Sequence, residues 1–225
     1  MKKLFALCLS VLLIVSALSG CGDKIVRPTQ LPSASSATEQ SPAAETADYP
    51  VALTAAEIAN FQTTLSSMEN YGFLLSDYSN VIDADLYQIF YTGAGMNNPQ
   101  NSSEIVNAYL TASGEGNPDC DATVLTTQQI NDFLMLKTGH SLSDMKSTLG
   151  WAYIEQYDAY LHFHGDTNYV PGVCIGGRLI GENLYEIEYT FDGGIYDDNS
   201  NLLTGGTVTV KNTGDKMQFV SNSLH

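Results

Sequence analysis

The chain has 225 residues and a formal net charge of −16 at pH 7, with thirteen Tyr and eight Phe. All of the net negative charge falls after residue 50, where five Lys or Arg stand against twenty-one Asp or Glu. So acidic a surface repels nucleic acid and anionic headgroups, which excludes DNA-, RNA- and phospholipid-headgroup-binding proteins. It permits cations, neutral sugars and cationic peptides or proteins as ligands. The aromatic content is that of a globular protein.

Residues 1–20 are predicted to form a lipoprotein signal peptide. Lys2 and Lys3 make a positive region, and residues 4–18 make an apolar run that is too short for a good membrane span. The run leads into a Leu-Ser-Gly-Cys motif that ends at Cys21 and resembles a bacterial lipobox. The resemblance implies that Cys21 is the lipid anchor and that the mature chain lies outside the cytoplasm, on the cell membrane.

A flexible tether is predicted over residues 21–49 and a single folded domain over residues 50–225. The tether is rich in Ser, Ala, Thr, Pro, Gln and Glu and has no periodic apolar face, so burial cannot offset its ordering entropy. Two cysteines, Cys120 and Cys174, belong to the domain. An extracytoplasmic compartment permits a disulfide between them, and two independent buried thiols are the alternative.

Helical patterns fill the first part of the predicted domain. The stretch from Thr54 to Glu57 is a capping box, and apolar residues follow it at helical spacing. A second capping box begins at Thr126, and Gly139 is placed to end its helix as a C′ glycine. Further helices are predicted after Asp83, Ser102 and Ser141, and over residues 151–160.

After Pro171 the period of the apolar residues changes to two, which is typical of strands. Turns rich in Gly, Asn and Asp separate four such segments. These segments are residues 173–180, 184–191, 207–211 and 217–220. Helices first and strands last predict an α+β fold in which N-terminal helices are followed by a C-terminal antiparallel β-meander.

Residues 157–169, between the helical and strand patterns, carry the densest set of polar and aromatic side chains. In an extended chain His162, His164 and Asp166 share one face, because residues two apart point the same way. Two imidazoles and a carboxylate suit Zn²⁺ or another divalent ion with an open position. The string resembles the H-x-H-x-D-H element of metallo-β-lactamase-like hydrolases. Thr167 stands in place of that element's last His, and the βα repeats of that family are absent.

The same region is a candidate for ligand binding without a metal. Tyrosine offers a flat apolar face and a hydroxyl group, which suit recognition of a sugar or a peptide. Tyrosines at this spacing also suit a protein core, and the His and Asp side chains alternatively hydrogen-bond a turn. The candidate ligand-binding residues are Tyr157, Asp158, Tyr160, His164, Asp166 and Asn168.

Parts of the domain are similar to domains of uncharacterised lipoproteins and membrane-anchored proteins of Gram-positive Firmicutes. The similar pieces are Thr126–Gly139, Tyr153–Tyr160, His164–Asn168 and Ser221-Asn222. The resemblance implies an anchored, extracytoplasmic location and adds no mechanism. It makes Tyr157, Asp158, Gly165, Asp166 and Asn168 a signature, either of the fold or of a ligand.

Together these features predict a lipid-anchored extracytoplasmic protein that binds a ligand or an envelope partner without catalysis and without a cofactor. Its membrane contact is the N-terminal lipid, and its ligand is a protein, a peptide or a glycan. One alternative is a divalent-metal hydrolase that uses His162, His164 and Asp166. The other is a structural protein that contacts envelope proteins and has no small-molecule site.

Overall fold

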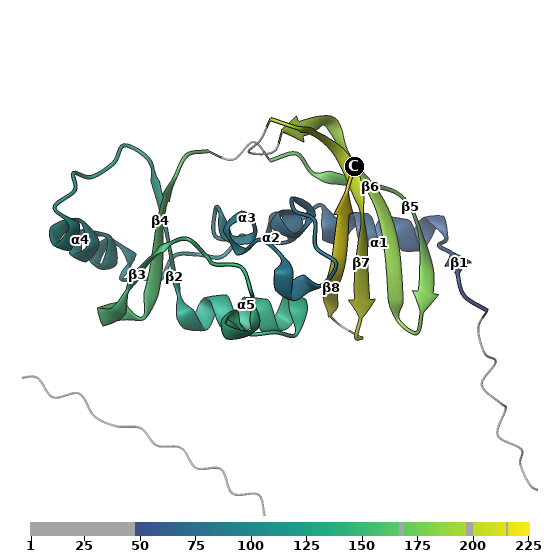
Figure 1. Ribbon diagram of the computed structural model, residues 1–225, viewed down its shortest axis with the longest axis horizontal. Helices are drawn as coiled ribbons and strands as arrows, with labels where there is room; N and C mark the ends of the chain where they lie inside the picture. Colours follow the sequence, from purple (N-terminus) through teal and green to yellow (C-terminus); the bar gives the residue numbers. More distant parts are fainter. Residues whose placement is uncertain (1–47, 167–168, 197–199, 215) are drawn as a thin grey trace, which may run out of the picture. The chain divides into compact units, whose positions relative to one another are not determined.

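The computed structural model describes residues 48–166, 169–196, 200–214 and 216–225 (Figure 1). The predicted signal peptide, the anchor Cys21, nearly all of the predicted tether and the candidate Asn168 lie outside the described residues. All described residues fall within one unit, Thr46–His225. No helix among them is both long and apolar enough to cross a bilayer.

The helices come mainly from the first half of the described chain. Short 3₁₀ segments separate several of them. The helices are α1 (Ala55–Leu65), α2 (Met68–Tyr71), α3 (Leu86–Phe90), α4 (Ser102–Ser113) and α5 (Thr127–Thr138), and the 3₁₀ segments are η1 (Gly72–Leu74), η2 (Val81–Asp83), η3 (Leu142–Asp144) and η4 (Glu155–Tyr157).

The strands form two sheets. They are β1 (Val51–Ala52), β2 (Asp121–Thr126), β3 (Ala152–Ile154), β4 (Ala159–His164), β5 (Gly172–Gly181), β6 (Leu184–Tyr196), β7 (Leu202–Asn212) and β8 (Met217–Leu224). The larger sheet has the order β1-β5-β6-β7-β8 and the smaller one the order β2-β4-β3.

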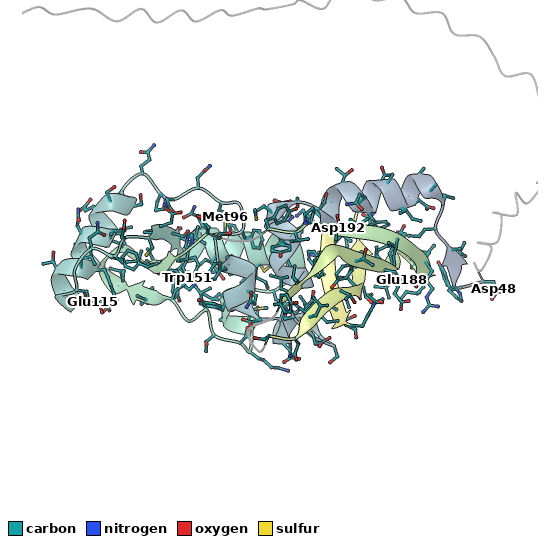
Figure 2. The ribbon with its side chains drawn as sticks, turned by 90° about the horizontal axis from the view of Figure 1, so that it is seen from above. Asp48, Met96, Glu115, Trp151, Glu188 and Asp192 are labelled. Atoms are coloured by element: carbon teal, nitrogen blue, oxygen red, sulfur yellow. The ribbon has the colours of Figure 1, made fainter. Side chains whose placement is uncertain are left out.

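In the larger sheet every pair is antiparallel, and β5 to β8 follow one another as the meander predicted from the period-two pattern. Alternation decides which face is buried: Ile187 pairs with Val208, and both are fully buried. Val173 and Ile175 point to the other face and are 41% and 59% exposed. Helix α1 lies along the buried side, as Figures 1 and 2 show.

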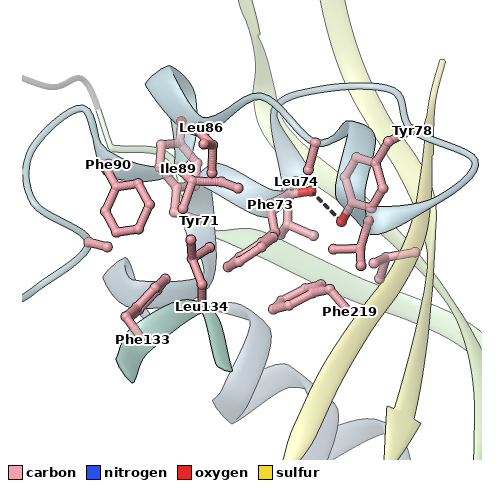
Figure 3. Close-up of a cluster of buried hydrophobic side chains, with 14 of the residues drawn as sticks. Tyr71, Phe73, Leu74, Tyr78, Leu86, Ile89, Phe90, Phe133, Leu134 and Phe219 are labelled. Carbon is pink, nitrogen blue, oxygen red and sulfur yellow. Dashed lines mark hydrogen bonds between the residues drawn. The ribbon is translucent and has the colours of Figure 1, made fainter. Parts of the chain in front are cut away.

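Stacked aromatic rings fill the core between the larger sheet and the helices (Figure 3). Phe73 of η1 and Phe219 of β8 stack with ring centroids 4.2 Å apart, and Phe133 of α5 stacks on Phe73 at 6.2 Å. Gly72 lets η1 approach α3, because an added Cβ would lie 2.3 Å from the backbone Cα of Ile89. A side chain at position 72 would therefore push these two elements apart.

A few buried polar groups join the helices to the larger sheet. Asn222 of β8 accepts a hydrogen bond from the Tyr189 hydroxyl (2.9 Å) and donates one to the Ser76 carbonyl (2.9 Å). At the other edge the Gln62 amide of α1 donates to the Gly172 carbonyl (3.0 Å) and accepts from the Cys174 N–H (2.7 Å). Both bonds satisfy backbone groups that strand β5 would otherwise leave open at the sheet edge.

The smaller sheet is covered on both faces. Ile105 of α4 packs on one face against Val124, Ala159 and Leu161. The opposite face carries the alternate residues of the strands, and there Leu125 joins the main core. This second sheet is the main departure from the predicted fold.

The prediction of N-terminal helices followed by a C-terminal β-meander is wrong. Strand β2 lies between α4 and α5, and it pairs with β4 in a separate sheet that stands before the meander in the sequence. Strand β1 precedes all helices and extends the larger sheet at β5. The architecture is a mixture of helices and two antiparallel sheets.

The helix predicted over residues 151–160 is also wrong. These residues form β3, η4 and the start of β4, and Tyr153 pairs with Tyr160 across the hairpin. The reversal occurs at Asp158, which has a positive φ of 45°. The apolar spacing of Tyr153, Ile154 and Tyr157 fits a helix, but Asp158 turns the chain before a helix forms.

Two predicted capping boxes are confirmed. Thr54 and Glu57 exchange side chain-to-backbone hydrogen bonds at the start of α1, and Thr126 and Gln129 do so at the start of α5. Gly139 ends α5 in the left-handed conformation, as predicted.

The two cysteines of the domain do not form a disulfide with each other. Both are free thiols, with Cys120 exposed and Cys174 buried. Burial raises the pKa of the Cys174 thiol to about 11. The alternative prediction, two independent buried thiols, is therefore right for Cys174 and wrong for Cys120, which is exposed.

Candidate functional site

The predicted metal ligands His162 and His164 lie on strand β4 and face a cluster of aromatic rings. The His162 ring stacks on Trp151 at a centroid distance of 5.3 Å and meets Tyr87 and Tyr91 of the α3 region edge-on at 5.2 and 5.4 Å. His164 stacks beside it at 5.6 Å. We call these five residues, Tyr87, Tyr91, Trp151, His162 and His164, the imidazole cluster.

Both ring nitrogens of His164 are engaged by the protein. Nδ1 lies 2.9 Å from the Gly165 carbonyl, which can only accept, so Nδ1 carries the hydrogen. Nε2 lies 2.7 Å from the Thr123 hydroxyl of β2 and accepts its hydrogen. A metal ion at either nitrogen would have to displace one of these bonds.

Aromatic packing holds the His162 ring on three sides. Its Nε2 atom is buried and has no hydrogen-bond partner among the described residues, and the same is true of the Trp151 Nε1 atom. Burial lowers the pKa of His162, and the neighbouring His164 lowers it further. The ring is therefore kept neutral more readily than a free histidine.

Asp166 does not join the two histidines. Its side chain is exposed and lies on the wall of a separate groove. No group of three His, Cys, Asp or Glu side chains close enough to hold a metal ion occurs among the described residues. The described structure thus does not assemble the triad of His162, His164 and Asp166.

Three of the candidate ligand-binding residues serve the β3–β4 hairpin. Asp158 accepts hydrogen bonds from the Thr127 hydroxyl (2.5 Å) and the Tyr153 hydroxyl (2.9 Å), and these bonds lower the pKa of its carboxyl group. Tyr157 donates to Glu104 of α4 at 2.9 Å, which raises the pKa of Tyr157. Tyr160 packs on Tyr153 at a ring distance of 4.9 Å. The side chains of Asp158 and Tyr157 thus tie the hairpin to α5 and α4.

A groove of about 790 Å³ opens on the described surface. Its walls come from two distant parts of the sequence: helices α2 and α3 with the loop that follows, and the end of β6 with the start of β7. Its volume is within the range of about 300–1,000 Å³ that is usual for small-molecule sites. We call this hollow the tyrosine groove.

Tyrosines and two aspartates give the tyrosine groove its chemistry. Its aromatic members are Tyr71, Tyr87, Tyr91 and Tyr196, and its acidic members are Asp85 and Asp166. Tyr196 stands 73% exposed, so its ring is free to lie on a ligand. No Lys, Arg or His belongs to the described lining.

The start of α3 positions one wall of the tyrosine groove. Asp85 caps this short helix, since its Oδ1 accepts from the N–H groups of Tyr87 (2.9 Å) and Gln88 (3.4 Å). Leu86 and Phe90 turn into the core, and Tyr87 and Tyr91, four residues apart, point the other way. The two tyrosines therefore line the groove and also belong to the imidazole cluster.

Of the predicted site residues that the structure describes, only Asp166 lines the groove. Tyr87 and Tyr91 were not singled out by sequence reasoning, although their spacing opposite an apolar face was a usable signal. Comparison with protein-family models, with curated proteins and with solved structures finds no match to this chain.

Proposed function

We propose that the protein is a lipid-anchored, extracytoplasmic binding protein that holds a small ligand in the tyrosine groove without transforming it. The observation that carries the proposal is the groove itself: about 790 Å³, lined by four tyrosines and by aliphatic side chains such as Ile89 and Leu203. A concave site that joins apolar surface to a few orienting polar groups is the usual form of a ligand site, and polar and apolar groups both contribute to this lining.

The anchor part of the proposal rests on the N-terminal sequence. A positive start, an apolar run and the motif ending at Cys21 are the signals of a lipoprotein. Two or more acyl chains on one cysteine would give stable attachment, because each buried CH₂ contributes about 0.8 kcal/mol. The tether then presents the groove to molecules outside the membrane.

Recognition is favoured over catalysis because the polar groups near the groove have structural tasks. One Asp85 oxygen is bound to two backbone N–H groups of α3. Both nitrogens of His164, the nearest candidate base in the imidazole cluster, are hydrogen-bonded within the protein. The tyrosine rings remain as the surfaces that a ligand can contact.

The test uses the full chain in an uncharged maltoside detergent, with isotopically labelled tyrosine. Three probes are titrated separately: a lysine-containing peptide, a glutamate-containing peptide of the same length, and an N-acetylglucosamine disaccharide. At least one probe is expected to shift the amide NMR signals of Tyr87, Tyr91 and Tyr196. The signals of Tyr109 and Tyr153, which lie outside the groove, serve as internal controls.

A variant confirms the location. Tyr196→Ser should abolish the shifts, while Ile175→Ser, at an exposed apolar position on the open face of the larger sheet, should leave them unchanged. If none of the three probes moves the groove signals, the proposal is wrong.

A further inference from the structure

The walls of the tyrosine groove carry negative charge that the described protein leaves unneutralised. Asp85 and Asp166 both line it, and neither forms an ion pair with a lysine or arginine of the described chain. Building on the proposed binding function, we infer that the ligand is a cationic peptide: a lysine or arginine side chain next to an apolar one.

Three of the basic residues of the described chain form ion pairs away from the groove. Lys137 pairs with Glu69 at 2.8 Å, Lys146 with Asp83 at 2.8 Å and Arg178 with Glu186 at 2.6 Å. No side chain of these pairs lines the tyrosine groove. A positive group from outside the chain is thus the natural partner of the two aspartates.

The aromatic lining suits the same partner. An ammonium or guanidinium group within about 6 Å of a ring centroid is attracted to the ring face, by about 0.5–1 kcal/mol where the site is open to solvent. Tyr196, 73% exposed, and Tyr91, on the opposite wall, offer such faces. The aliphatic stem of a lysine or an adjacent leucine can lie on Ile195 and Leu203, which also line the groove.

The field of the whole chain acts in the same direction. The net charge of −16 attracts cationic molecules to the surface and repels anionic ones. General attraction alone would be spread over the surface, so the groove must be shown to bind more tightly than the rest of the acidic surface. The experiment therefore compares binding at the groove with binding to the rest of the acidic surface.

The experiment measures affinity by calorimetry on the full chain in the same uncharged detergent. The probe is the capped peptide Lys-Leu-Lys, and its matched control is the same peptide with both lysines acetylated, which keeps the length and removes the charge. The lysine peptide is expected to bind at least about tenfold more tightly. Its affinity should fall as NaCl rises from about 50 mM to about 500 mM, because salt screens the attraction.

Substitutions locate the charge effect. Asp166→Asn and Asp85→Asn should each weaken binding by about threefold, the order expected for a partly exposed ion pair. Asn retains the side-chain acceptor with which Asp85 caps α3. The control is Asp119→Asn, which removes an exposed carboxylate outside the groove lining and should leave affinity unchanged.

The outcomes are distinct. If the acetylated peptide binds as tightly as the lysine peptide, or if Asp119→Asn weakens binding as much as Asp166→Asn, the inference is overturned. If the N-acetylglucosamine disaccharide shifts the groove tyrosines and the lysine peptide does not, the inference fails and the proposed binding function stands. If no probe reaches the groove, both fail.

Discussion

The two sheets of the described chain differ in what covers their faces. The larger sheet packs one face on helices and aromatic rings and leaves the other open, with Val173 and Ile175 exposed. The smaller sheet packs α4 on one face, and on the other the rings of Tyr87, Tyr91 and Trp151 pack on His162 while Tyr153 stays 50% exposed. The side chains that look most like an active site thus lie among packed rings.

The side chains with the most reactive groups are therefore not the ones that a ligand reaches most easily. His162 and His164 have ring nitrogens suited to metal binding or proton transfer, yet rings pack on His162 and both nitrogens of His164 are hydrogen-bonded within the protein. The accessible hollow lies beside them, where the α3 tyrosines meet the end of β6. A sequence cannot reveal such a separation unless the pairing of its strands is known.

The largest expected loss of stability comes from a substitution in the packed face of the larger sheet. Phe219→Ala removes a ring that is 1% exposed and stacks on Phe73 at 4.2 Å. The free energy of unfolding should fall by about 3–5 kcal/mol, because the substitution leaves a cavity in the core. Urea unfolding followed by circular dichroism measures the change.

The matched control lies on the smaller sheet. Phe163→Ala removes a half-buried ring that contacts Tyr109 at 6.0 Å. Its cost should be clearly smaller, about 1–2 kcal/mol. Equal losses for the two variants would contradict the view that the main core lies under the larger sheet.

An effect of intermediate size, on the pH dependence of stability, is expected at the imidazole cluster. The pKa of His162 is lowered in the folded chain from its ordinary value of 6.5, so the unfolded chain takes up this proton first as the pH falls. Stability from this group is complete above about pH 6.5 and is lost as the pH falls below that value. The groups that face His162 are His164, the rings of Tyr87 and Tyr91, and the Trp151 indole.

His162→Phe keeps the ring packing and removes the titrating group. The variant should lose less unfolding free energy than the parent between about pH 7.5 and about pH 5.5, the range over which histidine titrates. His140→Phe, outside the cluster, should retain the parent's pH dependence. A parent and a His162→Phe variant with identical slopes would show that the cluster does not disfavour the imidazolium.

The smallest effect is expected on the open face of the larger sheet. Ile175→Thr keeps the β-branch at a position that is 59% exposed, so stability should change by no more than about 0.5 kcal/mol. Ile187→Thr buries a hydroxyl at a fully buried position of the opposite face and should cost about 2–3 kcal/mol. Thermal unfolding of the two variants compares the faces directly, and a large loss for Ile175→Thr would mean that this face is covered.

Local signals in the sequence predicted the parts of the fold that depend on neighbouring residues. The capping boxes at Thr54 and Thr126 and the C′ glycine Gly139 act within a few residues, and each is present. The strands after Pro171 were recognisable because alternation and turns repeat along consecutive segments.

Features that depend on distant partners escaped prediction. Strand β2 is six residues long and runs directly into α5, so no local signal in the sequence distinguishes it from a loop. The β3–β4 hairpin depends on Asp158, whose turn is held by Thr127 from another element. The tyrosine groove joins residues 68–94 to residues 166–203, a meeting that only the assembled sheet creates.

The account's central claim is that ligand is bound in the tyrosine groove and not over His162 and His164 of β4 or at the β3–β4 hairpin. Photo-crosslinking tests it most directly: the full chain in uncharged detergent is irradiated with the capped Lys-Leu-Lys peptide carrying a benzophenone, and the crosslinked segments are identified by mass spectrometry. The account predicts crosslinks within residues 85–94 and 194–203, competed by excess unmodified lysine peptide. Crosslinks concentrated within residues 153–164, or spread evenly over the acidic surface, would contradict it.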